Sequence, residues 1–236
     1  MSAGGRVTRR RFVSGAGWTT LAGMATLSVG CGAVSPPLRV QRSFGLPSPR
    51  LGGSAPLEEV LADRRSRREF TSRALTEQEI SQLLWAAQGV TADWGGRTSP
   101  SAGALYPLEL YVLTAGGYCH YVPRAHRLEV LADRDLREEA AAAGLGQSAL
   151  RDAPLVLVIS AVYARSERKY GARGRRYAQL EAGHVAQNVL LQAVSLKLAA
   201  VPIGAFDDER LIRTLHLPGG HAPLYLLAVG HPRTLA

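Results

Sequence analysis

The segment RRSRREF, residues 64–70, holds the side chains best suited to binding an anion. In an extended chain alternate side chains point the same way, so Arg64, Ser66 and Arg68 would share one face and Arg67 would face water. Two guanidinium groups and a hydroxyl can saturate one phosphate dianion. The alternative is a solvated arginine cluster, which is the commoner outcome for an isolated run of this kind. The segment alone does not separate the two interpretations.

A second segment, SPSAGALYP at residues 99–107, is rich in small residues. Ser101, Ala102 and Gly103 would let the backbone approach a flat ligand closely, with Ser101 as a polar contact. The alternative is an ordinary surface loop. The segment belongs to a long stretch rich in Gly, Pro and Ser, and loops of that length in compact domains are often functional.

A third segment, VPIGAF at residues 201–206, places Gly204 and Ala205 after a short predicted strand. Bare backbone amides there could face a ring, although a strand end that needs small residues for packing would look the same. Taken together, the three segments predict a site for a flat, phosphorylated cofactor. The chain contains neither G-x-G-x-x-G nor G-x-x-x-x-G-K-[ST], so a Rossmann dinucleotide site and a P-loop are not supported.

Hydrophobic periodicity and turn residues predict the elements that must position these segments. Helices are predicted near residues 56–61, 76–88, 133–144, 177–198 and 207–215, and strands near 108–114, 118–122, 127–131, 153–163, 200–206 and 222–230. Thr76 and Glu79 form a capping-box pattern at the start of the second helix. The helix at 177–198 is apolar almost all round, which suits the centre of a domain or a subunit interface. The order of elements indicates an α+β domain.

Composition excludes several classes of protein. The formal charge of +9 includes four arginines in residues 1–31, which hold no acid, so the remainder carries only +5. Aromatic residues make up 6% of the chain, which argues against nucleic-acid binding. The two cysteines, Cys31 and Cys119, form no C-x-x-C pair, and the six histidines show no ligand spacing. A disulfide framework and a metal site are therefore not indicated.

The first 31 residues have the order of an export signal. Thr8-Arg9-Arg10-Arg11-Phe12-Val13 resembles a twin-arginine motif, and a moderately apolar run follows it. Cys31 is a possible lipidation site, although Ser28 stands where a lipoprotein signal usually has a bulky residue. Residues 32–55 are rich in Pro, Gly and Ser and are predicted to be a linker. The alternatives are a disordered basic terminus and a weak membrane anchor.

The ordered set R-R-S-x-R-x-F, P-S-A-G-A-L-Y-P, L-E-A-G-H-V-A-Q-N and P-I-G-A-F resembles the nitroreductase superfamily of FMN enzymes, from about residue 56 to the C-terminus. The resemblance implies a nitroreductase-like fold, with a central antiparallel or mixed sheet flanked by helices, and a domain-swapped homodimer with flavins at the interface. It also implies the residues that contact FMN. These are Arg64, Arg65, Ser66 and Arg68 for the phosphate and ribityl chain, Pro100, Ser101, Ala102, Gly103 and Leu105 along the flavin, Ile203, Gly204 and Ala205 at its ring, and Arg233 as a further phosphate contact.

The stretch ERKYGARGRRYAQLEAGHVAQN at residues 167–188 resembles the SagB-type branch, which includes azoline dehydrogenases. In that branch a Lys-Tyr pair beside the flavin exchanges protons, which maps to Lys169 and Tyr170. A base is chemically required when hydride leaves for flavin N5, and a partly desolvated lysine would be a competent one. The alternative is a mobile basic loop that only covers the cofactor. Glu181 and His184 are predicted to be structural.

We therefore expect residues 56–236 to form an exported, FMN-dependent oxidoreductase that works by ping-pong hydride transfer. Its substrate would be a small molecule or a peptide, its location periplasmic or at the cell surface, and its assembly a homodimer. An alternative is a flavin- or ligand-binding lipoprotein without turnover. A basic nucleic-acid or membrane-surface protein is a third possibility, which predicts no flavin and strongly salt-dependent binding to polyanions.

Overall fold

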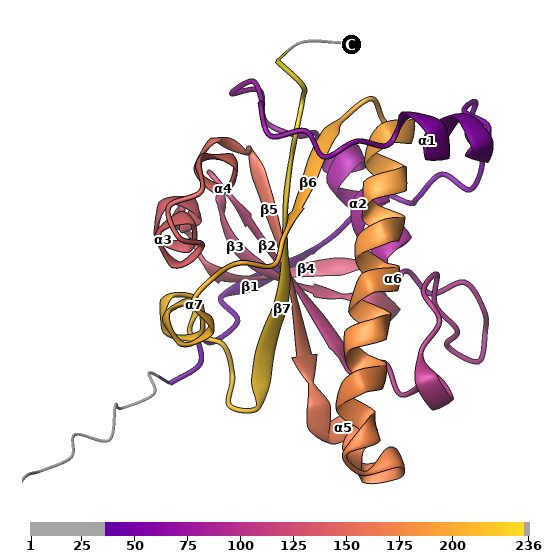
Figure 1. Cartoon of the computed structure of the whole chain (residues 1–236), viewed down its shortest axis with the longest axis vertical. Coiled ribbons are helices and arrows are strands. Elements are labelled where there is room, and N and C mark those ends of the chain that lie inside the picture. Colours follow the sequence, from indigo (N-terminus) through magenta and orange to yellow (C-terminus); the bar gives the residue numbers. More distant parts are fainter. Residues whose placement is uncertain (1–35, 234–236) are drawn as a thin grey trace, which may run out of the picture. The chain divides into compact units, whose positions relative to one another are not determined.

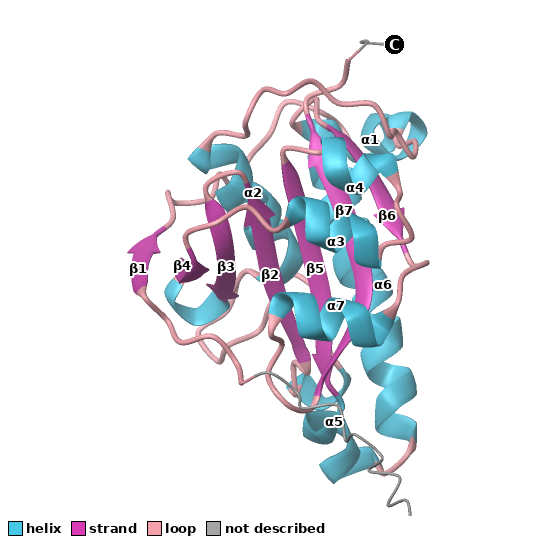
Figure 2. Cartoon of the chain, turned by 90° about the vertical axis from the view of Figure 1, so that its left-hand side faces the viewer, coloured by secondary structure: helices cyan, strands magenta, loops and turns pink. Residues whose placement is uncertain are grey.

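Seven strands form one antiparallel sheet in the computed structural model, which describes residues 36–233 (Figure 2). Their order across the sheet is β1-β4-β3-β2-β5-β7-β6. The strands are β1 (Arg42–Gly45), β2 (Leu108–Thr114), β3 (Gly117–Val122), β4 (Arg127–Ala132), β5 (Leu155–Val162), β6 (Ala199–Ile203) and β7 (His221–Gly230). The predicted α+β class, with an antiparallel sheet flanked by helices, is confirmed.

Helices cover both faces of this sheet. They are α1 (Leu57–Asp63), α2 (Glu77–Gln88), α3 (Arg137–Ala143), α4 (Ser148–Asp152), α5 (Tyr163–Tyr170), α6 (Arg173–Ser195) and α7 (Asp208–Leu215), with short 3₁₀ turns η1 (Ala102–Ala104) and η2 (Pro123–Ala125). Figure 1 shows α1, α2 and α6 on one side of the sheet and α3, α4 and α7 on the other. The long helix α6 lies on the first of these two sides, and candidate site residues lie close to both of its ends.

The central strand β5 explains why the sheet needs two helical layers. Its sequence LVLVISAV is buried almost throughout. Leu157 and Ile159 pack in the cluster that contains α6, whereas Val156 and Val158 pack in the cluster that contains α3 and α7. Successive side chains of a strand alternate between faces, so a continuous apolar run requires cover on both sides.

The start of α2 has the predicted capping box. Thr76 Oγ1 accepts a hydrogen bond from the Glu79 amide, and the Glu79 carboxylate accepts one from the Thr76 amide at 2.7 Å. These bonds satisfy amides that have no partner within the helix. The helix then ends at Gln88, whose side chain enters the candidate site.

The prediction that residues 32–55 form only a linker is wrong for part of that segment. Residues 42–45 form β1, which pairs antiparallel with β4. Farther along, Ser81 Oγ donates to the Pro47 carbonyl at 2.5 Å, and Gln82 exchanges hydrogen bonds with the backbone of Arg50. The segment lacks its own apolar period because its backbone is satisfied by partners distant in sequence. The ordered domain therefore begins before residue 56.

Helix α6 is buried on one face only, although its sequence is apolar almost all round. Its Val185 and Val189 side chains are fully buried, but Leu180 is 53% exposed, and His184 and Gln187 are exposed. One face of α6 thus packs on the sheet, while the other carries an apolar side chain in contact with solvent. The helix also begins at Arg173, four residues before the predicted start.

The predicted export signal of residues 1–31 and the possible lipid anchor at Cys31 lie outside the described residues. Within residues 36–233, no helix is both long enough and apolar enough to cross a membrane.

Candidate functional site

The arginine-rich segment is extended and lies along the edge strand β6. Ser66 forms a parallel bridge with Ala200, and the Arg67 amide donates to the Ala200 carbonyl at 3.0 Å. This places the segment at the edge of the sheet, directly after α1. The extended backbone is what makes alternate side chains diverge.

Alternation divides the arginines into two groups. Arg65 and Arg67 line a cavity of about 610 Å³ together with Lys197, which follows α6. Arg67, which we expected to face water, is half-buried there, whereas Ser66 and Arg68 are exposed. Arg65 Nη1 also donates to the Ala62 and Arg64 carbonyls at 2.7 and 2.9 Å, which caps the end of α1. Arg65 therefore has a structural role as well as its predicted ligand role.

The C-terminal segment lies beside the arginines. Phe70 bridges Pro232, and the Arg233 amide donates to the Glu69 carbonyl at 3.3 Å. The exposed side chain of Arg233 is thus carried next to Arg68. The structure brings together residues that are about 165 positions apart in the chain.

The end of β6 extends this group. Gly204 and Ala205 are exposed, and a Cβ atom added at Gly204 would lie 3.6 Å from the Tyr225 ring. Gln147 Nε2 donates to the Ala205 carbonyl at 2.9 Å. Ile203 is only 4% exposed and packs in the core, so its side chain is not available to a ligand. The backbone after β6 offers a flat surface of small residues.

The second group begins with the loop of residues 99–107, which we call the P-S loop. It contains three left-handed residues: Gly103 (φ 63°), Ala104 (φ 54°) and Tyr106 (φ 44°). Two of them are not glycine, and each such conformation costs on the order of 1 kcal/mol. Ser101 Oγ accepts a hydrogen bond from the Tyr106 amide at 2.9 Å, which closes the turn. Strained backbone held this way is common at functional sites.

Lys169 and Tyr170 meet the P-S loop at Gly103. A Cβ atom added at Gly103 would lie 2.6 Å from Tyr170 Oη and 2.9 Å from Lys169 Nζ. Both side chains come from the last turn of α5, so they stand on a helix rather than in a loop. Lys169 is exposed, so the desolvation that we expected at its amine is not present within the single chain.

Arg165 fastens α5 to the same loop. It donates to the Tyr106 carbonyl at 3.1 Å and forms an ion pair with Glu109 of β2. Burial alone would raise the pKa of Glu109, but the hydrogen bond from His120 and the nearby Arg165 outweigh it and lower that pKa. Arg165 lies one helical turn before Lys169 and so fixes the helix that carries the pair.

A buried polar network lies behind the P-S loop, and the sequence did not predict it. Arg97 Nη1 donates to Gln88 Oε1 at 2.6 Å, and Gln88 Nε2 donates to Glu181 Oε1 at 3.4 Å. The Arg97 guanidinium also stacks 4.3 Å above the Tyr106 ring. Glu181 is 2% exposed, whereas His184 on the same helix is exposed. The sequence did offer one signal of this buried group, because Glu181 is an acidic residue in a helix predicted to be apolar almost all round.

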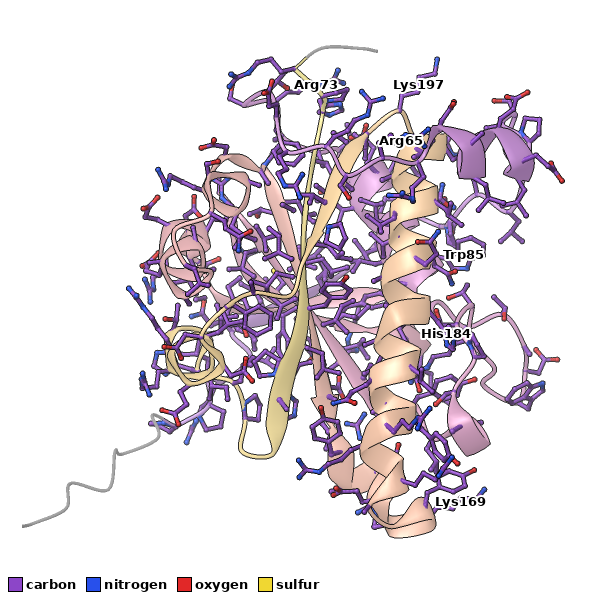
Figure 3. All side chains as sticks on the ribbon, viewed as in Figure 1. Arg65, Arg73, Trp85, Lys169, His184 and Lys197 are labelled. Carbon is purple, nitrogen blue, oxygen red and sulfur yellow. The ribbon has the colours of Figure 1, made fainter. Side chains whose placement is uncertain are left out.

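The two groups of candidate residues lie at opposite ends of α6. Tyr170 precedes the helix by three residues and Lys197 follows it by two. A helix of 23 residues is about 34 Å long. Figure 3 shows Lys169 near one end and Arg65 and Lys197 near the other. Within one protomer Lys169 and Tyr170 therefore lie at the opposite end of α6 from Lys197 and the arginine segment.

Within residues 36–233, no group of three or more His, Cys, Asp or Glu side chains could hold a metal ion. The Cys119 thiol is half-buried in β3, and burial raises its pKa to about 11. A thiol with this pKa is a poor nucleophile at neutral pH. Neither observation adds a second type of reactive centre.

Comparison with known proteins gives one consistent family. The sequence model of the Nitroreductase family matches residues 61–231. A protein of Methanocaldococcus jannaschii assigned as a nitroreductase, MJ1384, is 46% identical over 180 residues, which cover 74% of this chain and 90% of that protein. A crystal structure from Ralstonia eutropha JMP134, also assigned as a nitroreductase, is similar with a TM-score of 0.73 and 30% identity, covering 85% of this chain and 96% of the other.

Two more distant relatives carry functional names. The microcin B17-processing protein McbC of Escherichia coli is 29% identical over 132 residues, which cover 51% of this chain and 48% of McbC. An FMN reductase [NAD(P)H] of Bacillus subtilis is 24% identical over 186 residues, which cover 73% of this chain and 64% of that protein.

Proposed function

The chain belongs to the nitroreductase family of oxidoreductases, and we propose that it is an exported, FMN-dependent enzyme that transfers hydride between two substrates in turn. The observation that carries the proposal is the contact of Gly103 with Lys169 and Tyr170, since it joins a strained loop to a candidate proton donor. The FMN reductase among its relatives supports the choice of cofactor.

The residues present fit an FMN molecule at both of its ends. Arg64, Ser66, Arg68 and Arg233 offer cationic and hydroxyl groups for the phosphate, from a backbone held against β6. Gly204 is exposed and has no side chain of its own, so its backbone could lie against a flat ring. FMN, when bound, supplies the atom that accepts and releases hydride. The side chains of this protein orient it and manage the accompanying proton.

The separation along α6 supports a site shared between two copies of the chain. If two α6 helices lie antiparallel, the Arg64 end of one copy meets the Gly103 end of the other. The exposed Leu180 side chain, about a third of the way along α6, offers apolar surface for that contact. We propose a symmetric homodimer with two equivalent sites, each built from both copies.

Lys169 and Tyr170 are the proposed proton donor and acceptor. The Lys169 ammonium lies 5.4 Å from the centre of the Tyr170 ring, and that ring packs edge-on against Tyr177. A partner copy placed over this surface would exclude water from around Lys169. The reducing and oxidising substrates are a small molecule or a peptide, and the peptide option draws on the likeness to McbC.

Export through the twin-arginine route and a lipid anchor at Cys31 complete the proposal. They rest on residues 1–31 of the sequence, and cell fractionation with Cys31→Ser as the comparison variant tests them. Export predicts protein outside the cytoplasm, and lipidation predicts that the variant loses membrane attachment. Cytoplasmic protein in both cases would contradict this part.

The decisive experiment is the visible absorption spectrum of the purified chain. We expect a flavin spectrum, either as isolated or after addition of FMN, which bleaches with a chemical reductant and recovers with an acceptor. Protein that stays colourless after reconstitution would overturn the proposal. Protein that binds FMN but exchanges no electrons with any donor or acceptor would instead be a flavin-binding module.

A further inference from the structure

Three cations line the cavity of about 610 Å³ at the ends of α1 and α6, which we call the α1–α6 cavity. They are Arg65, Arg67 and Lys197, and among residues 36–233 none of the three forms an ion pair. In the described part of the chain Asp63 is the only acid of the lining, so the cavity keeps a net charge of +2. Unpaired cations around a hollow surface concentrate anions there. The lining does not include the proposed contacts of the FMN phosphate, Arg64, Ser66, Arg68 and Arg233.

The backbone holds the two arginines on this side of the segment. The Arg67 amide donates to the Ala200 carbonyl at 3.0 Å, which ties the extended chain to β6. Alternation then points Arg65 and Arg67 away from Arg64 and Arg68. Arg65 Nη1 donates to two carbonyls at the end of α1, and these bonds use one of the three nitrogens of its guanidinium. A donor that is already held in place loses less conformational entropy when a ligand binds.

Lys197 is placed by the turn that ends α6. Its amide donates to the Val194 carbonyl, and the Leu198 amide donates to the Ala193 carbonyl, both at 2.8 Å. This is the Schellman pattern, in which the residue at the position of Lys197 is left-handed, here with φ 57°. Glycine is the usual residue at this position because it adopts that conformation without steric cost. The turn therefore does not need the lysine side chain, which supplies a cation to the cavity.

The chemistry of the lining defines a class of ligand. Arginine and lysine side chains bind phosphate oxygens, and a phosphate monoester carries close to two negative charges at neutral pH. The rest of the lining includes apolar side chains, Val194, Leu198 and Pro232. The volume of the cavity lies in the range of small-molecule sites, about 300–1,000 Å³.

We propose that the α1–α6 cavity binds a phosphate monoester attached to an apolar body, at a site separate from that of the FMN phosphate. The ester is a soluble organic phosphate or a lipid headgroup, since both present the same chemistry to the cavity. The proposal goes beyond the oxidoreductase function and does not depend on it, because no residue of the lining is among the proposed contacts of FMN.

The first test measures the Kd of phenyl phosphate for the full chain by calorimetry, with saturating FMN so that the proposed flavin site is filled. We expect Arg67→Ala with Lys197→Gly to raise this Kd by about tenfold to a hundredfold, because charge-assisted bonds are lost. The Kd of FMN should stay unchanged. Arg64→Ala with Arg68→Ala should weaken FMN and leave phenyl phosphate bound. Equal weakening of both ligands by Arg67→Ala with Lys197→Gly would indicate one shared phosphate site and overturn the inference.

The choice of substitutions keeps the fold intact. Arg65 is left in place because it caps α1, and glycine suits the left-handed backbone at Lys197. The melting temperature of the double variant should therefore not fall below that of the wild type. Failure of FMN to bind the wild type would contradict the proposed function alone, since the same variants measured with phenyl phosphate in the absence of FMN still decide this inference.

The second test measures co-sedimentation with phosphatidylcholine vesicles, with and without phosphatidic acid, in a Cys31→Ser background so that no acyl chain of the protein contributes. The matched control is Arg134→Ala with Arg151→Ala, which removes the same charge from exposed, ion-paired arginines. Binding that depends on Arg67 and Lys197 for phenyl phosphate identifies a soluble ester, and binding that depends on them for phosphatidic acid identifies a lipid headgroup. No difference from the control in either test would overturn the inference.

Discussion

Alternate side chains of an extended segment point to opposite sides, so Arg64 and Arg68 point away from Arg65 and Arg67. The first pair stays outside the cavity that the second pair lines with Lys197. Four neighbouring arginines therefore serve two surfaces. This separation limits the proposed FMN phosphate contacts among these arginines to Arg64 and Arg68, whereas the sequence motif also included Arg65.

We expect Arg64→Ala combined with Arg68→Ala to raise the Kd of FMN by about tenfold to a hundredfold, because charge-assisted bonds to the phosphate are lost. Flavin fluorescence titration measures this. Arg134→Ala with Arg151→Ala removes the same charge from exposed, ion-paired arginines near α3 and α4 and should leave the Kd unchanged. Equal effects of the two double variants would indicate a general charge effect.

Lys169→Ala should retain bound flavin but lower kcat by about 10²- to 10⁴-fold, the usual contribution of a positioned acid or base. The flavin spectrum and steady-state rates with one donor and one acceptor measure the two effects. Arg168→Ala changes the neighbouring exposed cation on α5 and is the control. Full activity in Lys169→Ala would remove its catalytic role.

Glu181 predicts a pH dependence of stability. Burial raises the pKa of the folded-state carboxyl to about 7 from an ordinary value of 4.5, so the folded chain holds a proton that the unfolded chain has released between these values. The free energy of unfolding should therefore be greatest at low pH on this account and fall by on the order of 3 kcal/mol as pH rises through 7. Urea unfolding of wild type and Glu181→Gln measures it. An identical pH slope in both proteins would show that Glu181 ionises normally.

At the scale of elements, the local sequence of α2 helps to position a side chain of the candidate site. Its capping box fixes where the helix starts, and its length then places Gln88 against Glu181. Helix α5 is fixed differently, since Arg165 ties it to Glu109 and to the Tyr106 carbonyl. Helix α5 therefore contacts the P-S loop directly, whereas α2 places Gln88 against the buried Glu181.

We expect Thr76→Ala to lower the free energy of unfolding by about 1 kcal/mol, because the Glu79 amide loses its acceptor at the start of α2. Chemical denaturation measures the change. Thr76→Ser keeps the hydroxyl and should restore most of the loss. Equal destabilisation by alanine and serine would show that the methyl group, rather than the cap, carries the effect.

At the scale of the whole molecule, the division of candidate residues between the two ends of α6 is the reason for proposing a site shared by two copies. The sheet holds the arginine segment at β6, and the β5–α5 connection holds Lys169 at the other end of α6. No rearrangement of side chains can shorten a continuous helix of this length. A second copy, placed as proposed, would bring the two sets of residues together without any change in the fold.

Leu180→Glu should convert a dimer to a monomer and reduce flavin retention at the same time, because a charge would be buried at the contact between α6 helices. Analytical ultracentrifugation and the ratio of flavin to protein absorbance measure both. Leu145→Glu alters a leucine that is also exposed, beyond α3, and should change neither. A Leu180→Glu variant that remains dimeric with full flavin would place the interface elsewhere.

The sequence by itself determined the α+β class, the positions of most strands, the capping box of α2 and the family. These features depend on local periodicity and on ordered motifs, which are readable along the chain. It also indicated that Lys169, Tyr170 and the P-S loop belong to one site.

Only the tertiary structure decided the role of residues 42–45, the separation of the arginines and the burial of Glu181. Strand β1 depends on hydrogen bonds to β4, some 85 residues later, so no local pattern encodes it. The network of Gln88, Arg97 and Glu181 joins α2, a loop and α6. Local sequence specifies which face of an element is apolar, whereas partners distant in the chain decide which polar group is enclosed there and what it contacts.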